Sequence, residues 1–131
     1  MRVFISTRSQ DRLEVLASGL RQLDHTPLFV DGEFDSLLAW WATVRGKVNA
    51  AEVVLIDADG EEDILGFDYF LAGMCEALGM QVIVVGGAGA KDALEPVPLN
   101  LNPRNKFYLD FAEACDLYFS TARAMRGERA L

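Results

Sequence analysis

The sequence predicts a doubly wound α/β domain, in which helices cover both faces of a parallel sheet. Strand-like and helix-like periodicities alternate from one end of the chain to the other. Two of the strand patterns, residues 53–56 and 82–85, are unbroken apolar runs, which is typical of central strands buried on both faces. These observations predict a flavodoxin-like, five-stranded parallel sheet in a three-layer α/β/α arrangement. With 131 residues, the chain is long enough for one core, so residues 1–131 are expected to form a single domain.

The amino-terminal half alternates strand, helix, strand, helix. Residues 3–5 form the first strand pattern, and Ser9 is placed to cap the helix that follows. The apolar stripe of that helix consists of Leu13, Leu16, Ala17, Leu20 and Leu23. A Pro-containing turn ends it, and residues 28–30 are expected to form a short second strand. A second helix, capped by Asp35 or Ser36, is predicted from the stripe of Leu37, Trp40, Trp41, Val44 and Val48.

The carboxyl-terminal half continues the alternation. After the strand at 53–56 and an acidic loop, a third helix is predicted from Ile64, Phe67, Leu71, Met74, Cys75 and Leu78. Gly79 is placed to end that helix. The stretch after the strand at 82–85 is too rich in Gly, Pro and Asn for a regular element. Residues 106–108 predict a short edge strand, and the stripe of the closing helix is Phe111, Cys115, Tyr118, Ala122 and Met125.

Composition excludes several classes of protein. A formal net charge of -8 argues against nucleic acid as a partner, because affinity for the phosphate backbone comes from clustered Lys and Arg. No apolar stretch approaches the roughly 20 residues of a membrane-spanning helix, and no secretory signal opens the chain. We therefore expect a cytoplasmic protein that does not enter a membrane. Cys75 and Cys115 lie in helical apolar patterns, where a thiol acts as a small buried apolar group.

The candidate binding residues follow the strands. In an open parallel sheet, ligands bind beyond the carboxyl ends of the strands, where the direction of winding reverses. The loops expected there contain Ser6, Thr7, Arg8, Asp31, Asp57, Asp59, Asp63, Gly86 and Gly87. Crowded carboxylates can serve as nucleophile, general acid or hydroxyl acceptor, although acids also cap helices and favour helix N-termini. The glycines would let backbone N–H groups approach an anion, or simply form a flexible loop.

Other polar and aromatic residues have a simpler interpretation. The lone His25 falls between two predicted elements, at the opposite end of the sheet from the candidate site, and is interpreted as a turn residue. Trp40 and Trp41 fit the apolar stripe of their helix, which favours packing in the core or between subunits over stacking on a base. No Cys and His spacing typical of a metal site is present, and we expect no metal and no cofactor.

Four segments carry a family resemblance. Residues 3–6 (Val-Phe-Ile-Ser) lead into a polar turn and a helix, and residues 49–55 (Asn-Ala-Ala-Glu-Val-Val-Leu) enter the third strand. Residues 63–85 run from an acid, through a helix containing Ala-Gly and ending Ala-Leu-Gly, to a Val-rich strand. Residues 105–108 read Asn-Lys-Phe-Tyr. The layout resembles the nucleoside 2-deoxyribosyltransferase-like family, and its opening is similar to the related TIR-type NAD-cleaving domains.

The resemblance implies cleavage of the N-glycosidic bond of a nucleoside or nucleotide by a homo-oligomer. It implies that a helix-borne glutamate attacks the anomeric carbon, while nearby aspartates bind sugar hydroxyls and the leaving base. The position corresponding to that glutamate is Leu71, and leucine cannot be a nucleophile.

Two interpretations remain open. In the first, Asp68, three residues before Leu71 on the same helix face, supplies a displaced carboxylate, with Asp59 and Asp63 as neighbouring catalytic acids. Asp57 and Asp59 would then contact the sugar or the base, and Ser6 with Arg8 a 5′ group. In the second, the domain binds a nucleotide, or acts through its oligomer, without catalysis. A TIR-like NAD-cleaving domain is a further alternative. A phosphoacceptor domain using Asp57 is disfavoured, because residues 6–8 lack the paired acids that would hold magnesium.

Overall fold

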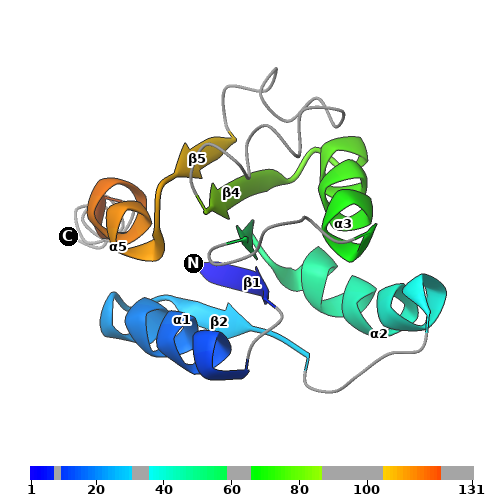
Figure 1. Ribbon diagram of the computed structural model, residues 1–131, viewed down its shortest axis with the longest axis horizontal. Helices are drawn as coiled ribbons and strands as arrows, with labels where there is room; N and C mark the ends of the chain where they lie inside the picture. The colour runs from blue at the N-terminus through cyan, green and yellow to red at the C-terminus, as the bar shows by residue number, and fades with distance from the viewer. Residues whose placement is uncertain (8–9, 31–35, 59–65, 87–104, 122–131) are drawn as a thin grey trace.

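The computed structural model describes residues 1–7, 10–30, 36–58, 66–86 and 105–121 (Figure 1). These residues form a five-stranded, all-parallel sheet with the order β2-β1-β3-β4-β5. The strands are β1 (Arg2–Ser6), β2 (Thr26–Leu28), β3 (Val53–Asp57), β4 (Gln81–Val85) and β5 (Lys106–Tyr108). The helices are α1 (Gln10–Gln22), α2 (Leu37–Ala50), α3 (Gly66–Ala77) and α5 (Phe111–Ala114), which continues into a π-helical segment at Cys115–Phe119. The order confirms the predicted flavodoxin-like fold.

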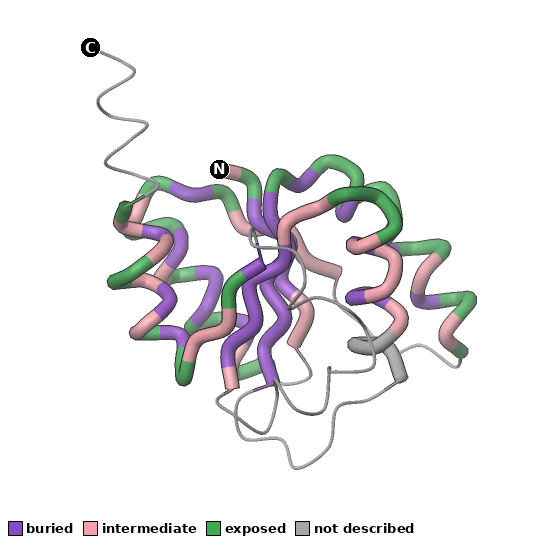
Figure 2. Tube along the Cα trace, turned by 90° about the horizontal axis from the view of Figure 1, so that it is seen from above, coloured by how far each residue is buried: buried purple, intermediate pink, exposed green. Residues whose placement is uncertain are grey.

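The two faces of the sheet pack against different helices. On one face, side chains of β1, β3 and β4 form a core with α2 and α3, including Phe4, Val44 and Ile56. On the other face, alternate side chains of the same strands pack against α1 and α5, with Leu16 and Phe119 fully buried. The central strands are buried on both sides, as Figure 2 shows by colour. This explains why their sequences are continuous apolar runs.

The ends of α2 and α3 follow predicted capping signals. Ser36 is the N-cap of α2, and its hydroxyl accepts a hydrogen bond from the Ala39 N–H at 3.1 Å. Gly79 ends α3 with φ of 70°, a left-handed conformation that glycine adopts without steric cost. The N–H groups of Gly79 and Met80 return to the carbonyls of Glu76 and Cys75, which is a Schellman motif. Gly79 was predicted to end this helix, and Ser36 was one of the two caps predicted for α2.

The second strand was predicted two residues too late. β2 spans Thr26–Leu28 rather than residues 28–30, because its register is set by its parallel pairing with β1. Arg2 pairs with Thr26 and Phe4 with Leu28. Pro27 is tolerated because β2 is an edge strand with β1 as its neighbour. Local hydrophobicity therefore did not decide where this strand begins.

The closing helix has a different buried face from the predicted stripe. Phe111, Ala114 and Phe119 are buried, whereas Cys115 and Tyr118 are only partly buried. The π-helical segment widens the turn, so the buried side chains after Ala114 are spaced by five residues rather than by three or four. The end of the predicted stripe, at Ala122 and Met125, lies outside the described residues.

His25 is a buried connector, which corrects its interpretation as a simple turn residue. The residue is 3% exposed, and its Nδ1 lies 2.9 Å from the amino group of Met1. Its Nε2 lies 2.9 Å from the carbonyl oxygen of Phe119, whose ring packs edge-on against the imidazole. An ammonium can only donate and a carbonyl can only accept, so Nδ1 accepts a hydrogen bond and Nε2–H donates one. His25 thereby ties β1 and the closing helix to the turn after α1.

Candidate functional site

The direction of winding reverses between β1 and β3. These strands are neighbours in the sheet, although α1, β2 and α2 lie between them in the sequence. In the parallel register, Ser6 pairs with Ile56, so Thr7 and Asp57 both leave the sheet at the same edge. In doubly wound folds this switch point is the usual place for a ligand, because the two connecting segments diverge from it. Two predicted binding residues therefore meet at this point.

Asp57 is the centre of a polar cluster at the switch point. Its side chain is only 2% exposed, and its carboxylate accepts three hydrogen bonds. The Thr7 hydroxyl donates to Oδ2 at 2.8 Å. The Arg12 guanidinium donates from Nε to Oδ2 at 3.1 Å and from Nη2 to Oδ1 at 2.9 Å. This bidentate geometry is the strongest and most directional form of an ion pair in proteins.

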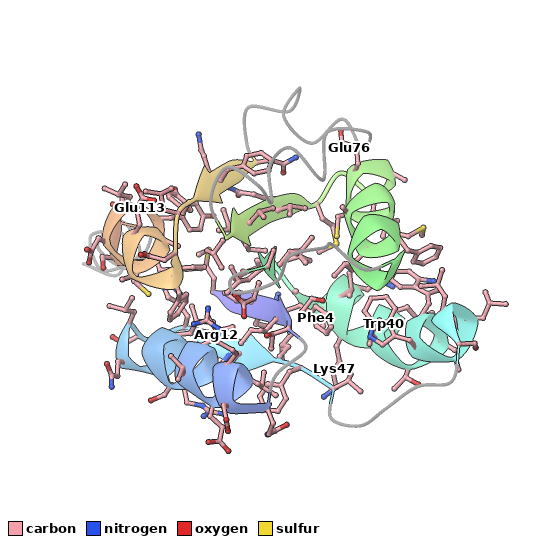
Figure 3. All side chains as sticks on the ribbon, viewed as in Figure 1. Phe4, Arg12, Trp40, Lys47, Glu76 and Glu113 are labelled. Atoms are coloured by element: carbon pink, nitrogen blue, oxygen red, sulfur yellow. The ribbon has the colours of Figure 1, made fainter. Side chains whose placement is uncertain are left out.

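Arg12 is a functional candidate that the sequence analysis missed. It lies in the first turn of α1 in the structure, with its side chain 31% exposed, on the side of α1 that faces the sheet (Figure 3). A cation is unfavourable at this end of a helix because the macrodipole is positive there. That unfavourable placement was a signal in the sequence that Arg12 has an anionic partner. The sequence alone did not indicate which of the many carboxylates it would be.

Gly86 is required by a close backbone approach. Its φ is 144°, and a Cβ built on it would lie 2.8 Å from the carbonyl carbon of Ala58. Its N–H donates to the carbonyl of Tyr108 at 3.1 Å, and the Ala58 N–H donates to the carbonyl of Val85 at 2.8 Å. The Gly86 N–H is therefore paired within the protein. The glycine therefore allows the backbone after β4 to pass close to the backbone after β3 at the edge of the sheet.

The described residues cover part of the predicted site. Ser6 and Thr7 are partly buried at the end of β1, Asp57 is buried at the end of β3, and Gly86 follows β4. The predicted residues outside the described ranges are Arg8, Asp31, Asp59, Asp63 and Gly87. Asp68 belongs to the first turn of α3, and its side chain is likewise outside what the structure describes. Of the acids in the predicted carboxylate cluster, Asp57 is therefore the one whose side chain the structure describes.

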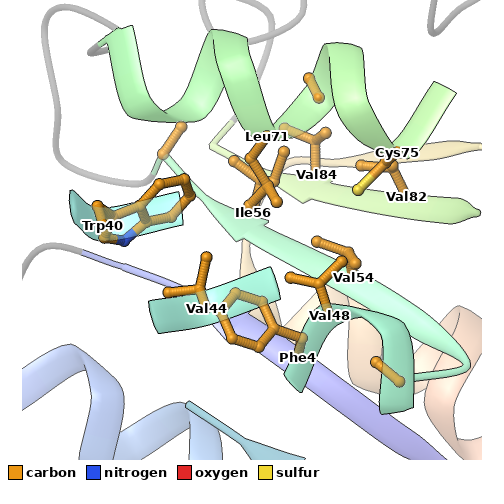
Figure 4. Packing of buried hydrophobic residues seen from close by; sticks show 13 residues of the cluster. Phe4, Trp40, Val44, Val48, Val54, Ile56, Leu71, Cys75, Val82 and Val84 are labelled. Carbon is orange, nitrogen blue, oxygen red and sulfur yellow. The ribbon is translucent and has the colours of Figure 1, made fainter. Parts of the chain in front are cut away.

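Leu71 lies in the core. It is 0% exposed and belongs to the cluster that α2 and α3 form with the sheet. Figure 4 shows its side chain between α3 and the sheet, beside Ile56 and Val84. A carboxylate at this position would replace an apolar contact on the inner face of α3, at a high desolvation cost. Position 71 is therefore a packing position in this protein.

No family model matches the chain, and a search of curated proteins finds no match.

Both cysteine thiols have raised pKa values. Burial raises the pKa of the Cys75 thiol to about 12 and that of Cys115 to about 11, so neither is a thiolate near neutral pH. The Asp57 carboxylate is held by Arg12 and Thr7 rather than directed outward.

Within the described ranges, no group of three or more His, Cys, Asp or Glu side chains could hold a metal ion. No helix of those ranges is long and apolar enough to span a membrane.

Trp40 and Trp41 have separate packing roles. Trp40 is 8% exposed within one chain and belongs to the core cluster of α2, so its burial needs no second subunit. Trp41 is partly buried, and its ring meets that of Phe70 from α3 edge-on, with centroids 5.4 Å apart. This pair closes the outer side of the contact between α2 and α3.

Proposed function

We propose that this protein binds a nucleoside or nucleotide at the switch point between β1 and β3 and does not cleave it. The observation that carries the proposal is the cluster of Thr7, Arg12 and Asp57. It joins the end of β1, the first turn of α1 and the end of β3 at the place where doubly wound domains bind ligands. A guanidinium fixed by a buried carboxylate presents hydrogen-bond donors in a defined orientation to a phosphate, sugar or base.

The absence of turnover is inferred from two positions. Leu71, which corresponds by resemblance to the family nucleophile, is a core residue with no exposed surface. Asp57 already accepts three hydrogen bonds, two of them from the Arg12 guanidinium, and these bonds hold its carboxylate in place. A carboxylate engaged in this way positions its neighbours rather than attacking a sugar. The same argument disfavours Asp57 as a phosphoacceptor.

Glycosidic-bond cleavage is the alternative function. Asp68 precedes Leu71 by three residues in α3, and a helix places residues at this spacing on the same side, one turn apart. A carboxylate there would be nearer the carboxyl edge of the sheet than Leu71, because α3 follows β3 and begins at that edge. This alternative predicts a nucleoside hydrolase or transferase, or an NAD-cleaving enzyme.

One experiment separates binding from cleavage. The protein is titrated with deoxynucleosides, their 5′-monophosphates and NAD, thermal unfolding is recorded, and the same samples are analysed for free base by chromatography. Binding without cleavage predicts a rise in the free energy of unfolding of about 2.7 kcal/mol at a ligand concentration 100 times Kd, with no free base. Thr7→Val should reduce the stabilisation, whereas Ser18→Ala, on the exposed face of α1, should not.

Two results would contradict the proposal. Release of free base from any compound would establish the alternative enzymatic function, and Asp68→Asn would then be the variant expected to abolish it. Failure of every compound to stabilise the wild-type protein would exclude a nucleoside or nucleotide site.

A further inference from the structure

The closing helix contains a turn that is wider than an α-helical turn. Before it, the Ala114 N–H donates to the Asp110 carbonyl at 3.2 Å, which is ordinary α-helical spacing. In the π turn, the segment Cys115–Phe119, the spacing is five residues, and the Ser120 N–H donates to the Cys115 carbonyl. Such a turn contains one residue more than an α-helix needs, and single π turns are frequent at functional sites.

The π turn determines which aromatic side chain faces the sheet. Phe119 is fully buried in the layer that α1 and α5 form with the sheet, whereas Tyr118 is only partly buried. A regular helix advances by about 100° per residue, so it would place position 118 about 20° from Phe111 around the helix axis and position 119 about 80° from it. Phe111 is itself buried. An α-helical turn would therefore direct Tyr118 toward the sheet and turn Phe119 to the side.

The sequence is compatible with this second, α-helical register. Phe111, Cys115 and Tyr118 are spaced by four and three residues, as in the apolar stripe of a regular amphipathic helix. The two aromatic rings that would exchange places are already in edge-on contact, with the centroids of Tyr118 and Phe119 5.1 Å apart. Phenylalanine and tyrosine differ by one hydroxyl group, so their exchange changes the volume of the core very little, and cores tolerate changes that conserve volume.

His25 holds the closing helix in the observed register. Its Nε2–H donates to the Phe119 carbonyl at 2.9 Å, and its ring meets the Phe119 ring edge-on, with centroids 5.6 Å apart. The residue is 3% exposed, so loss of this hydrogen bond would leave a buried donor without a partner. Its Nδ1 accepts from the Met1 amino group at 2.9 Å, which ties the helix register to the start of β1. A hydrogen bond between the Gln81 side chain and the Tyr118 hydroxyl favours the same register.

We propose that the closing helix has two registers and that His25 is the latch that holds it in the observed one. In the latched register, the π turn is present and Phe119 is buried. In the released register, the helix is α-helical throughout, the Phe119 carbonyl leaves His25, and Tyr118 takes the buried position. The segment after Ala114 rotates about its axis between the two registers, so Leu117, which is 60% exposed, moves with the state of the latch. Packed elements with two such arrangements convert a small local change into a larger one.

Pairs of alanine substitutions, measured by thermal unfolding, identify the register. In the latched register, Phe119→Ala should lower the midpoint temperature by about 10 °C or more, and Tyr118→Ala by about half as much. His25→Ala removes the latch, so in that protein the order should reverse, and Tyr118→Ala should be the more damaging substitution. Val3→Ala is the matched control, because it weakens the same core layer without touching the latch. In the Val3→Ala protein, Phe119→Ala should remain the more damaging substitution.

Deletion of Leu117 tests the extra residue without altering His25. The deletion shortens the π turn to α-helical length and leaves Phe119 in its place against His25, so the midpoint temperature should stay within about 3 °C of wild type. Deletion of Arg45 is the matched control, because Arg45 is also exposed but lies in the regular helix α2. That deletion rotates every later residue of α2 by about 100° and takes the fully buried Val48 out of the core, so it should unfold the protein.

Each contrary outcome overturns the proposal. If Phe119→Ala stays the more damaging substitution in the His25→Ala protein, the helix has no second register. If the order also reverses in the Val3→Ala protein, a general loosening of the core explains the reversal and His25 is not a latch. A His25→Ala protein that is unfolded by circular dichroism would show that His25 is needed for folding itself. If deletion of Leu117 unfolds the protein as deletion of Arg45 does, the fold requires the π turn and no α-helical register is accessible.

Discussion

Arg12→Met should destabilise the protein by leaving Asp57 buried without its cation. Methionine keeps the aliphatic stem of Arg12 and removes both charged hydrogen bonds to the carboxylate, whose side chain is 2% exposed. Breaking a buried ion pair from one side costs about 3–5 kcal/mol, because the remaining charge is not compensated. The hydrogen bond from Thr7 persists, and Arg12 is itself 31% exposed, so we expect a loss near the lower end, about 3 kcal/mol.

Urea unfolding followed by circular dichroism measures this loss. With a denaturant dependence of about 2 kcal/mol per molar urea, the midpoint should fall by about 1.5 M. Adding Asp57→Asn to Arg12→Met removes the unpaired charge and keeps an acceptor for Thr7, so the double variant should recover about 2 kcal/mol. Arg21→Met, an exposed arginine in the last turn of α1, should change stability by less than about 0.5 kcal/mol. A loss below about 1 kcal/mol for Arg12→Met, or no recovery in the double variant, would refute the buried-pair reasoning.

Three further predictions concern the core and the strand ends. Gly86→Ala should lower the free energy of unfolding by more than about 2 kcal/mol, because the φ of 144° and the 2.8 Å approach of a Cβ to the Ala58 backbone both oppose a side chain. Gly46→Ala is the control in urea unfolding. A Cβ at position 46 meets nothing within 4 Å, so this variant should stabilise α2 by up to about 1 kcal/mol. The free energy of unfolding should fall above pH 9, because the thiol of the unfolded chain ionises with its ordinary pKa of 9.0, while burial in the folded protein raises the pKa of Cys75 to about 12. Below pH 9 the buried thiol does not lower the free energy of unfolding, because it is protonated in both states. Between pH 9 and 12, Cys75→Ala should therefore lose less stability than wild type in parallel urea titrations. Equal dependence of the free energy of unfolding on pH in the two proteins would contradict the raised pKa of Cys75. Leu71→Ala should lower the free energy of unfolding by about 3 kcal/mol, and Leu71→Glu should lower it further because the glutamate also buries an unpaired carboxylate. A Glu variant as stable as the Ala variant in thermal unfolding would show that position 71 can face solvent.

The central strands could be predicted because burial on both faces of the sheet requires apolar side chains at successive positions. Each position of β3 from Val53 to Ile56 faces a helix layer on one side or the other, so the run is apolar throughout. The helix ends were predictable for a related reason, since Ser36 and Gly79 meet local backbone requirements that do not depend on the rest of the chain. β2 was placed incorrectly because an edge strand takes its register from its single neighbour.

Sequence by itself determined the fold class and the edge of the sheet at which Thr7 and Asp57 were expected. Parallel strands all present their carboxyl ends at one edge, and the observed pairing of β1 with β3 then brings the residues that follow these two strands close together. Tertiary structure alone decided that Arg12 pairs with Asp57, because a helix must have a particular rotation and distance from the sheet before one side chain can reach another. It also decided that His25 is buried against Phe119, and that Phe119 in the π-helical segment is fully buried while Tyr118 is only partly buried. Local periodicity sets which residues share a face, but packing sets which faces meet.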